Sequence, residues 1–272
     1  MLSNLVAWIS QGSHRLWISA ALFAFAILIG LIAFLRTPAA GQLATGRATN
    51  DPRDQAFSRW WAGSDEDRQA LITHRNGVCP NATFLLPAEG YIGLLYGDPR
   101  GPYSADHRHQ GVDIFSPSEP GLTPVIAAFD GYLTREAGWK SAVIIRIPDD
   151  PVKPGRQIWT YYTHMADASG NISYIDPAFP LDTHEVFIKQ GTRLGYTGNY
   201  SGNPFNPVGV HLHFSVVRDN GFGGYTNELD FNNTIDPSRY LGIAVNYGCA
   251  PVVPTCDPNP LCGDAILPPA GN

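Results

Sequence analysis

The stretch "NPVGVHLHFSVV", residues 206–217, places two histidines inside a segment that otherwise has the composition of a buried β-strand. Valine and phenylalanine favour an extended backbone, in which successive side chains point to opposite faces. His211 and His213 therefore project from the same face. An HxH pair also arises by chance, and a single histidine among apolar residues is commonly a hydrogen-bonded core residue. A metal site requires further ligands elsewhere in the chain.

A second group of metal-ligand residues lies upstream in "HRHQGVDIFSP", residues 107–117. His109 and Asp113 are four residues apart, and Gly111 between them allows a turn or a close approach of another chain segment. The alternative is a solvated histidine and an aspartate that brackets a turn. Together with one imidazole of the later pair, the two residues supply two nitrogens and a carboxylate. This ligand set leaves a coordination position open, as in catalytic zinc sites, although it also suits non-haem iron.

The composition predicts a globular, mainly β chain. Of 272 residues, 44% are hydrophobic and 15% are charged, which allows a sizeable core. The 28 glycines and 23 prolines suit many short strands joined by loops, and β-rich runs such as "SAVIIRIP" fill residues 84 to about 241. We expect an antiparallel, sandwich-like β core there. A net charge of -6 lacks the basic footprint of nucleic-acid binding, so no nucleic-acid partner is expected.

Two short helices are expected before this core, at residues 51–63 and 64–77. In the second, Ser64 is a good N-cap, acidic residues follow it, and Asn76-Gly77 is a stop signal. The tryptophans of "RWWAG", Trp60 and Trp61, are expected to dock this helical extension onto the main domain rather than to bind a ligand.

The N-terminal region contains an uncharged apolar run, residues 16–35, between Arg15 and Arg36. It is long enough to cross a bilayer as a helix, and we interpret it as a transmembrane anchor. The alternative is a long signal peptide cleaved near Ala40. The arginines that follow the run do not favour an external C-terminus, but long downstream domains cross largely regardless of charge.

The four cysteines predict disulfides and an oxidising compartment. Three of them lie in the Pro-rich stretch "CAPVVPTCDPNPLC", which lacks the CxxC pair expected of a cysteine zinc site. The simplest of three possible connectivities pairs Cys256 with Cys262 and Cys79 with Cys249.

A series of blocks in a fixed order makes the chain similar to a known family. The blocks are "FLLPAEGYIGLLYGDPRG", "HRHQGVDIFSP", "TPVIAAFDGYLTREAG", "YYTHMAD", "IKQGTRLGYTGN" and "GVHLHFSV". Over residues 84–241 the sequence resembles the lysostaphin or LytM-type zinc endopeptidases of bacterial cell walls. The resemblance implies that the metal ligands are His109, Asp113 and His213, and that His164 and His211 are catalytic.

The other histidines match no functional position of that family. His107 stands two residues before the ligand position and is expected on the rim of the site. His74 and His184 are expected to be surface or structural residues. Two segments, residues 165–191 and 199–210, are longer than a compact family member needs and would border the substrate groove, where they could select a substrate, bind a partner or cover the site.

The resemblance implies a zinc-dependent endopeptidase that hydrolyses peptide bonds in peptidoglycan, in the stem peptide or the cross-bridge. The expected organisation is an anchor or signal segment (1–36), a linker with short helices (37–83), the peptidase domain (84–241) and a Pro- and Cys-rich tail (242–272). The segment before residue 84 could also be inhibitory. The alternative is a catalytically silent module that binds the wall or regulates other wall hydrolases. In either case the domain is expected outside the cytoplasm, anchored to the membrane or secreted after cleavage.

Overall fold

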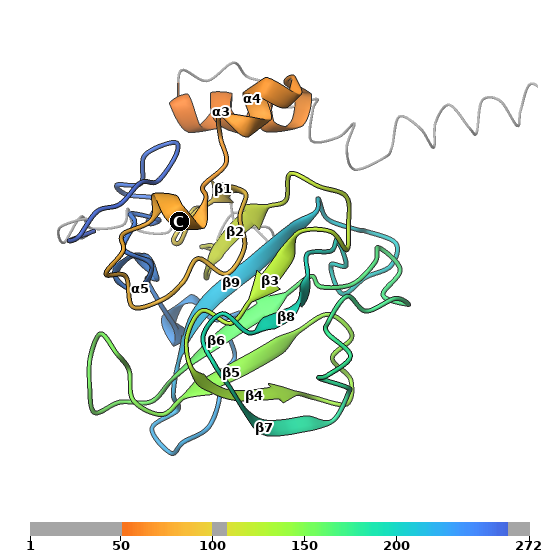
Figure 1. The fold of residues 1–272 in the computed structure, drawn as a ribbon, viewed down its shortest axis with the longest axis vertical. Coiled ribbons are helices and arrows are strands. Elements are labelled where there is room, and N and C mark those ends of the chain that lie inside the picture. Colours follow the sequence, from red (N-terminus) through yellow and green to blue (C-terminus); the bar gives the residue numbers. More distant parts are fainter. Residues whose placement is uncertain (1–50, 100–107, 261–272) are drawn as a thin grey trace, which may run out of the picture. The chain divides into compact units, whose positions relative to one another are not determined.

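The computed structural model describes residues 51–99 and 108–260, which form a mainly β unit with few and short helices (Figure 1). Its main feature is an eight-stranded sheet in which every pair of neighbouring strands is antiparallel. Seven strands follow the order β1-β2-β9-β6-β5-β4-β7, and β10 also pairs with β9. The predicted antiparallel β core is therefore confirmed.

The strands are short, as the frequent glycines and prolines predict. They are β1 (Tyr91–Leu94), β2 (Val112–Phe115), β3 (Pro124–Ile126), β4 (Gly131–Arg135), β5 (Val143–Ile147), β6 (Ile158–Thr163), β7 (Thr183–Ile188), β8 (Arg193–Tyr196), β9 (His211–Arg218) and β10 (Thr234–Ile235).

The second sheet contains only two strands, β3 and β8. Its buried residues Val125 and Leu194 belong to the same apolar cluster as Leu133, Ile145 and Phe214 of the large sheet. The two sheets therefore share one core, as in a sandwich.

The helical extension begins as predicted but ends early. Helix α3 (Pro52–Ala62) is followed by α4 (Asp65–Gln69), which starts with a capping box between Ser64 and Asp67. The prediction that this second helix continues to Gly77 is wrong. Leu71 and Ile72 are buried against the β domain, and the next residue pairs with Gly90 through backbone hydrogen bonds, so tertiary contacts replace helical ones.

Three further short helical elements complete the described secondary structure before the tail. A 3₁₀ turn, η1 (Arg75–Gly77), contains the predicted stop signal. Another 3₁₀ turn, η2 (Phe231–Asn233), and the short helix α5 (Ser238–Leu241) follow β9.

The tail packs onto the β domain and is held by a disulfide. Ile243 and Val245 are fully buried, and Cys79 is bonded to Cys256 with an S–S distance of 2.02 Å. The predicted pairs of Cys79 with Cys249 and of Cys256 with Cys262 are therefore wrong. The backbone N–H of Cys256 donates to the Gly77 carbonyl, and Cys256 forms a β-bridge with Ile243. These contacts bring the sulfur of Cys256, rather than that of Cys249, to Cys79. Cys249 is also disulfide-bonded, so disulfide formation itself is confirmed.

The predicted anchor, residues 16–35, lies outside the described residues, as do the linker up to residue 50 and His107. Within residues 51–99 and 108–260, no helix is both long and apolar enough to cross a membrane.

Candidate metal centre

The antiparallel register of β2 and β9 brings the two histidine motifs together. Asp113 lies directly opposite His213, so their side chains share one face of the sheet. His109 precedes β2, and the intervening Gly111 makes its approach possible: a Cβ there would lie 2.2 Å from the carbonyl oxygen of Phe214. The glycine of HxGxD is therefore required by the close packing of this segment against β9, in addition to the two ligand residues on either side of it.

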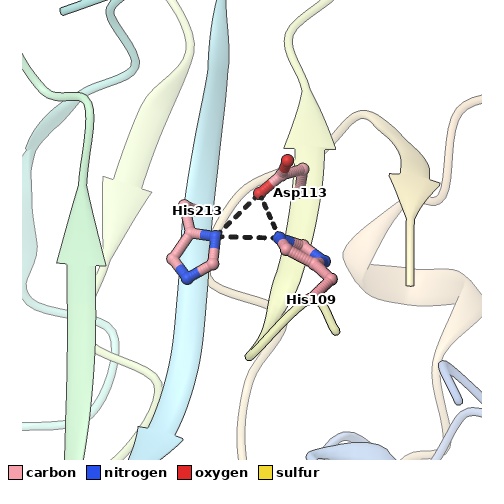
Figure 2. A group of neighbouring side chains, drawn as sticks. All are labelled: His109, Asp113 and His213. Carbon is pink, nitrogen blue, oxygen red and sulfur yellow. Dashed lines mark hydrogen bonds and ion pairs between the residues drawn. The ribbon is translucent and has the colours of Figure 1, made fainter. Parts of the chain in front are cut away.

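Three potential ligand atoms converge in a small triangle (Figure 2). The Nε2 atom of His109 is 3.1 Å from Asp113 Oδ1 and 3.1 Å from His213 Nδ1, and the last two atoms are 2.8 Å apart. Ligands about 2.0–2.1 Å from a tetrahedral zinc ion are separated by roughly 3.3 Å. The triangle is only slightly smaller than this, so the three residues fit one face of a tetrahedral metal site.

The hydrogen bonds behind the triangle orient the ligand atoms. His109 Nδ1 donates to the backbone oxygen of Leu95 at 3.1 Å, which leaves Nε2 with a lone pair that faces the triangle. The other nitrogen of His213, Nε2, lies 2.8 Å from the hydroxyl oxygen of Ser215. Buried acceptor atoms that face one another at this distance need a cation or a proton between them. Their chemistry therefore fits a metal ion.

The electrostatics of the cluster agree with this arrangement. Burial alone would raise the pKa of Asp113, but the adjacent imidazoles of His109 and His211 hold the pKa of this carboxyl well below its ordinary value. Burial lowers the pKa of His109, yet the carboxylate and the Leu95 carbonyl raise it above its ordinary value overall. A positive charge between these residues is therefore favoured, supplied either by a proton or by a metal ion.

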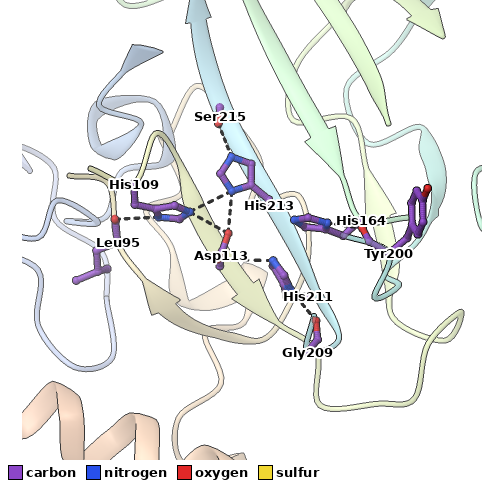
Figure 3. Close-up of polar contacts among 9 residues, drawn as sticks. All are labelled: Leu95, His109, Asp113, His164, Tyr200, Gly209, His211, His213 and Ser215. Carbon is purple, nitrogen blue, oxygen red and sulfur yellow. Dashed lines mark hydrogen bonds and ion pairs between the residues drawn. The ribbon is translucent and has the colours of Figure 1, made fainter. Parts of the chain in front are cut away.

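Two more imidazoles lie beside the triangle but outside it (Figure 3). The rings of His164 and His211 have centroids 4.4 Å apart, and His211 Nε2 is 3.6 Å from Asp113 Oδ2. His211 Nδ1 donates to the Gly209 carbonyl at 2.7 Å, and His164 Nδ1 donates to the Tyr200 carbonyl at 2.6 Å. With Nδ1 donating, Nε2 is the proton-accepting nitrogen of each neutral ring, and that of His211 faces Asp113.

His164 adopts an unusual backbone conformation. Its φ is 71°, in the left-handed region that non-glycine residues rarely occupy. Such strain costs on the order of 1–3 kcal/mol and is concentrated at functional sites. Burial and the neighbouring His211 lower the pKa of His164 to about 3, so its imidazole is neutral at neutral pH.

All five predicted site residues therefore meet in one place, while the other described histidines do not. His74 lies near Glu89 and His184 bonds to Asp182, both with side chains about half exposed. Ser215 was not among the predicted site residues, although it follows His213 by two residues and so had to share its face. The three orienting carbonyls carry no sequence signal, because any residue type supplies them.

Comparisons with known proteins give structural matches only. No protein-family model matches the sequence, and no curated protein matches it. Among solved structures, the chain is similar to lysostaphin from Staphylococcus simulans at 20% identity, over 52% of this chain and 46% of that one, with a TM-score of 0.32. The chain is similar to M23-type peptidases. One of them is the catalytic domain of the prophage-encoded M23 protein EnpA from Enterococcus faecalis, at 18% identity over 58% of this chain and 95% of that domain, with a TM-score of 0.32.

A third similar structure, Csd3 from Helicobacter pylori, matches at 18% identity over 59% of this chain, with a TM-score of 0.35. The match spans only 33% of the length of Csd3, and it spans less than half of lysostaphin. Because all three TM-scores lie below 0.5, the chemistry of the site has to be argued from its own side chains.

Proposed function

We propose that the chain is a zinc-dependent endopeptidase that hydrolyses peptide bonds in bacterial peptidoglycan. The observation that carries the proposal is the convergence of His109, Asp113 and His213 beside two imidazoles whose Nδ1 atoms are held by backbone carbonyls. Three protein ligands with an open position are typical of catalytic zinc, whereas structural zinc sites have four. The ordered sequence blocks of a cell-wall peptidase family, found around these residues, support the substrate class.

Zinc held by these three residues would polarise the scissile carbonyl and lower the pKa of a bound water to about 7. The chain itself supplies proton transfer. His164 and His211 are oriented by backbone carbonyls, and each presents Nε2 as a proton acceptor. One imidazole takes the proton of the attacking water; in this protonated form it stabilises the negative charge that develops on the carbonyl oxygen, and it then passes the proton to the leaving amine.

The cellular setting belongs to the same proposal. Residues 16–35 would anchor the chain in the membrane, with the β unit outside the cytoplasm, or would be cleaved to release it. The disulfide between Cys79 and Cys256 supports an oxidising compartment. The partners would be peptidoglycan peptides and, through the N-terminal helix, the membrane.

The test combines metal analysis of the purified chain with mass spectrometry of digested peptidoglycan. We expect about one zinc per chain and new peptide termini at one type of bond. The matched control is His211→Ala, which keeps the three ligands. It should bind zinc and release peptides at least about 100-fold more slowly.

The silent-module alternative is separated by the same experiment. Such a module would bind zinc and wall fragments but would leave purified peptidoglycan of several cross-bridge types intact. Absence of a stoichiometric metal in the wild-type chain, after incubation with zinc and removal of the excess, would sink the metallopeptidase proposal itself.

A further inference from the structure

Helix α3 lies outside the predicted peptidase domain, yet one of its residues reaches the catalytic side of the sheet. Trp60 is 3% exposed and packs on Tyr91, as expected of a docking residue. Trp61 behaves differently, because its side chain is 45% exposed and its ring meets Phe115 edge-on at 5.5 Å. The next ring beyond Phe115 is the imidazole of His211, 5.2 Å away.

Trp61 also lies directly against the backbone that orients His211. A Cβ at Gly209 would lie 2.3 Å from Cη2 of Trp61, so the indole fills the space that a side chain would take there. The carbonyl of Gly209 accepts the hydrogen bond from His211 Nδ1 at 2.7 Å. A continuous series of contacts therefore links Trp61 of α3 through Gly209 to the imidazole of His211.

The loop that carries Gly209 has little packing of its own. Residues 202–207 are exposed, and Phe205 has 92% of its surface in solvent. The segment is tied by backbone bonds from Val208 to Asn199 and from Ser116 to Val210. Trp61 adds an apolar contact on the side of Gly209 to these backbone bonds.

We infer that Trp61 is a positioning residue of the site: it holds the Gly209 carbonyl, which fixes His211 in the tautomer that leaves Nε2 free. Helix α3 is then a working part of the enzyme rather than only a connection to the N-terminal region. The activity readout of this inference rests on the proposed function, whereas its spectroscopic readout does not.

The test is a double-mutant cycle between Trp61→Phe and Gly209→Ala in the 272-residue chain. Phenylalanine keeps a ring against Phe115 but lacks the part of the indole that touches Gly209. Alanine at 209 adds the methyl group that collides with the indole. A small misplacement of a catalytic group costs up to about 100-fold in rate, so we expect Gly209→Ala to lower kcat by about 10- to 100-fold with KM and zinc content nearly unchanged.

The double variant tests whether Trp61 acts through Gly209. Because both changes act on one contact, its loss in kcat should be clearly smaller than the product of the two single losses. Losses that multiply, or a change confined to KM, would overturn the inference. The melting temperature of each variant separates loss of positioning from loss of folding.

Nitrogen-15 spectra of histidine-labelled protein give the second readout, which needs no substrate. In the wild type, His211 should carry its proton on Nδ1, and Gly209→Ala should add the other tautomer. Phe205→Ala, a solvent-exposed change in the same loop, should leave the tautomer unaltered. If the wild type hydrolyses no peptidoglycan but this shift is found, the proposed function fails while the positioning role holds. An unchanged tautomer in Gly209→Ala would refute that role.

Discussion

The two faces of β9 are built from alternating residues of one strand, yet they are buried in different ways. Leu212, Phe214 and Val216 are fully buried in the apolar core that the two sheets share. On the opposite face, His211 and His213 are shielded from solvent, but each is held by polar groups. The apolar face gains stability from burial, whereas the histidine face is stable only when its polar atoms find partners.

Neighbouring residues of one strand should therefore fail in different ways when they are replaced. Replacement of an apolar residue should lower the free energy of unfolding. Replacement of a polar residue should change metal content, rate or pH dependence.

The largest effect is expected from replacing a residue of the metal triangle. Asp113→Asn removes the negative charge that favours a cation, so metal affinity should fall by far more than the roughly 10- to 100-fold typical of losing an outer partner. Zinc content and hydrolysis should fall together, as they should for His109→Ala and His213→Ala. Dialysis against a zinc buffer followed by metal analysis measures this, and full retention of zinc by folded Asp113→Asn would exclude the ligand assignment.

Replacing either of the two other imidazoles should separate rate from metal binding. His164→Asn is the sharper variant, because asparagine tolerates the left-handed backbone at this position. We expect hydrolysis to fall by about 10²- to 10⁴-fold, the usual scale for a lost acid or base, with zinc near one per chain. His211→Ala should behave in the same way. If it loses zinc as completely as folded His213→Ala, the division of roles within the HxH pair is wrong.

The matched control on the apolar face is Leu212→Ala, between the two histidines. Its side chain is fully buried, so its truncation should lower the free energy of unfolding by about 2–5 kcal/mol. The fraction that remains folded should bind zinc and hydrolyse substrate at nearly the wild-type specific rate. Denaturant unfolding together with active-fraction kinetics checks this, and selective loss of zinc without loss of stability would contradict the separation of the two faces.

A smaller effect is expected at Ser215, the fully buried partner of His213 Nε2. Ser215→Ala leaves this nitrogen without its hydrogen-bond partner and should weaken zinc binding by about 10- to 100-fold. Competition with a chelator of known affinity measures the change. Ser215→Thr, which keeps the hydroxyl, is the control and should retain most of the affinity.

The effect that is smallest over any one pH unit is a pH dependence of stability. The pKa of His164 is about 3 in the folded chain, against an ordinary value of 6.5. Below pH 6.5 the unfolded chain therefore binds a proton that the folded imidazole does not, and stability is lost as the pH falls from 6.5 towards 3. This one group contributes at most about 1.4 kcal/mol per pH unit. In the presence of a chelator, urea unfolding of His164→Asn should show a correspondingly shallower pH slope; equal slopes would rule the contribution out.

Local rules predict the β character and the shared face of His211 and His213, since the alternation of a strand places residues i and i+2 on the same side whatever surrounds them. The choice of His109, Asp113 and His213 as ligands was implied by the family resemblance instead. The start of α4 at Ser64 was predictable for the same reason, because a cap bonds to its own helix.

How these local pieces meet depends on contacts that form only in the folded chain. Three of these contacts join residues that are distant in sequence: the pairing of Asp113 with His213, the bond of Cys79 to Cys256 and the contact of Trp61 with Gly209. The end of α4 at Gln69 depends on such contacts. Every residue has a backbone carbonyl, so no sequence pattern distinguishes the three that orient the imidazoles. Their roles arise from where the folded backbone passes, which is set by packing of the whole core.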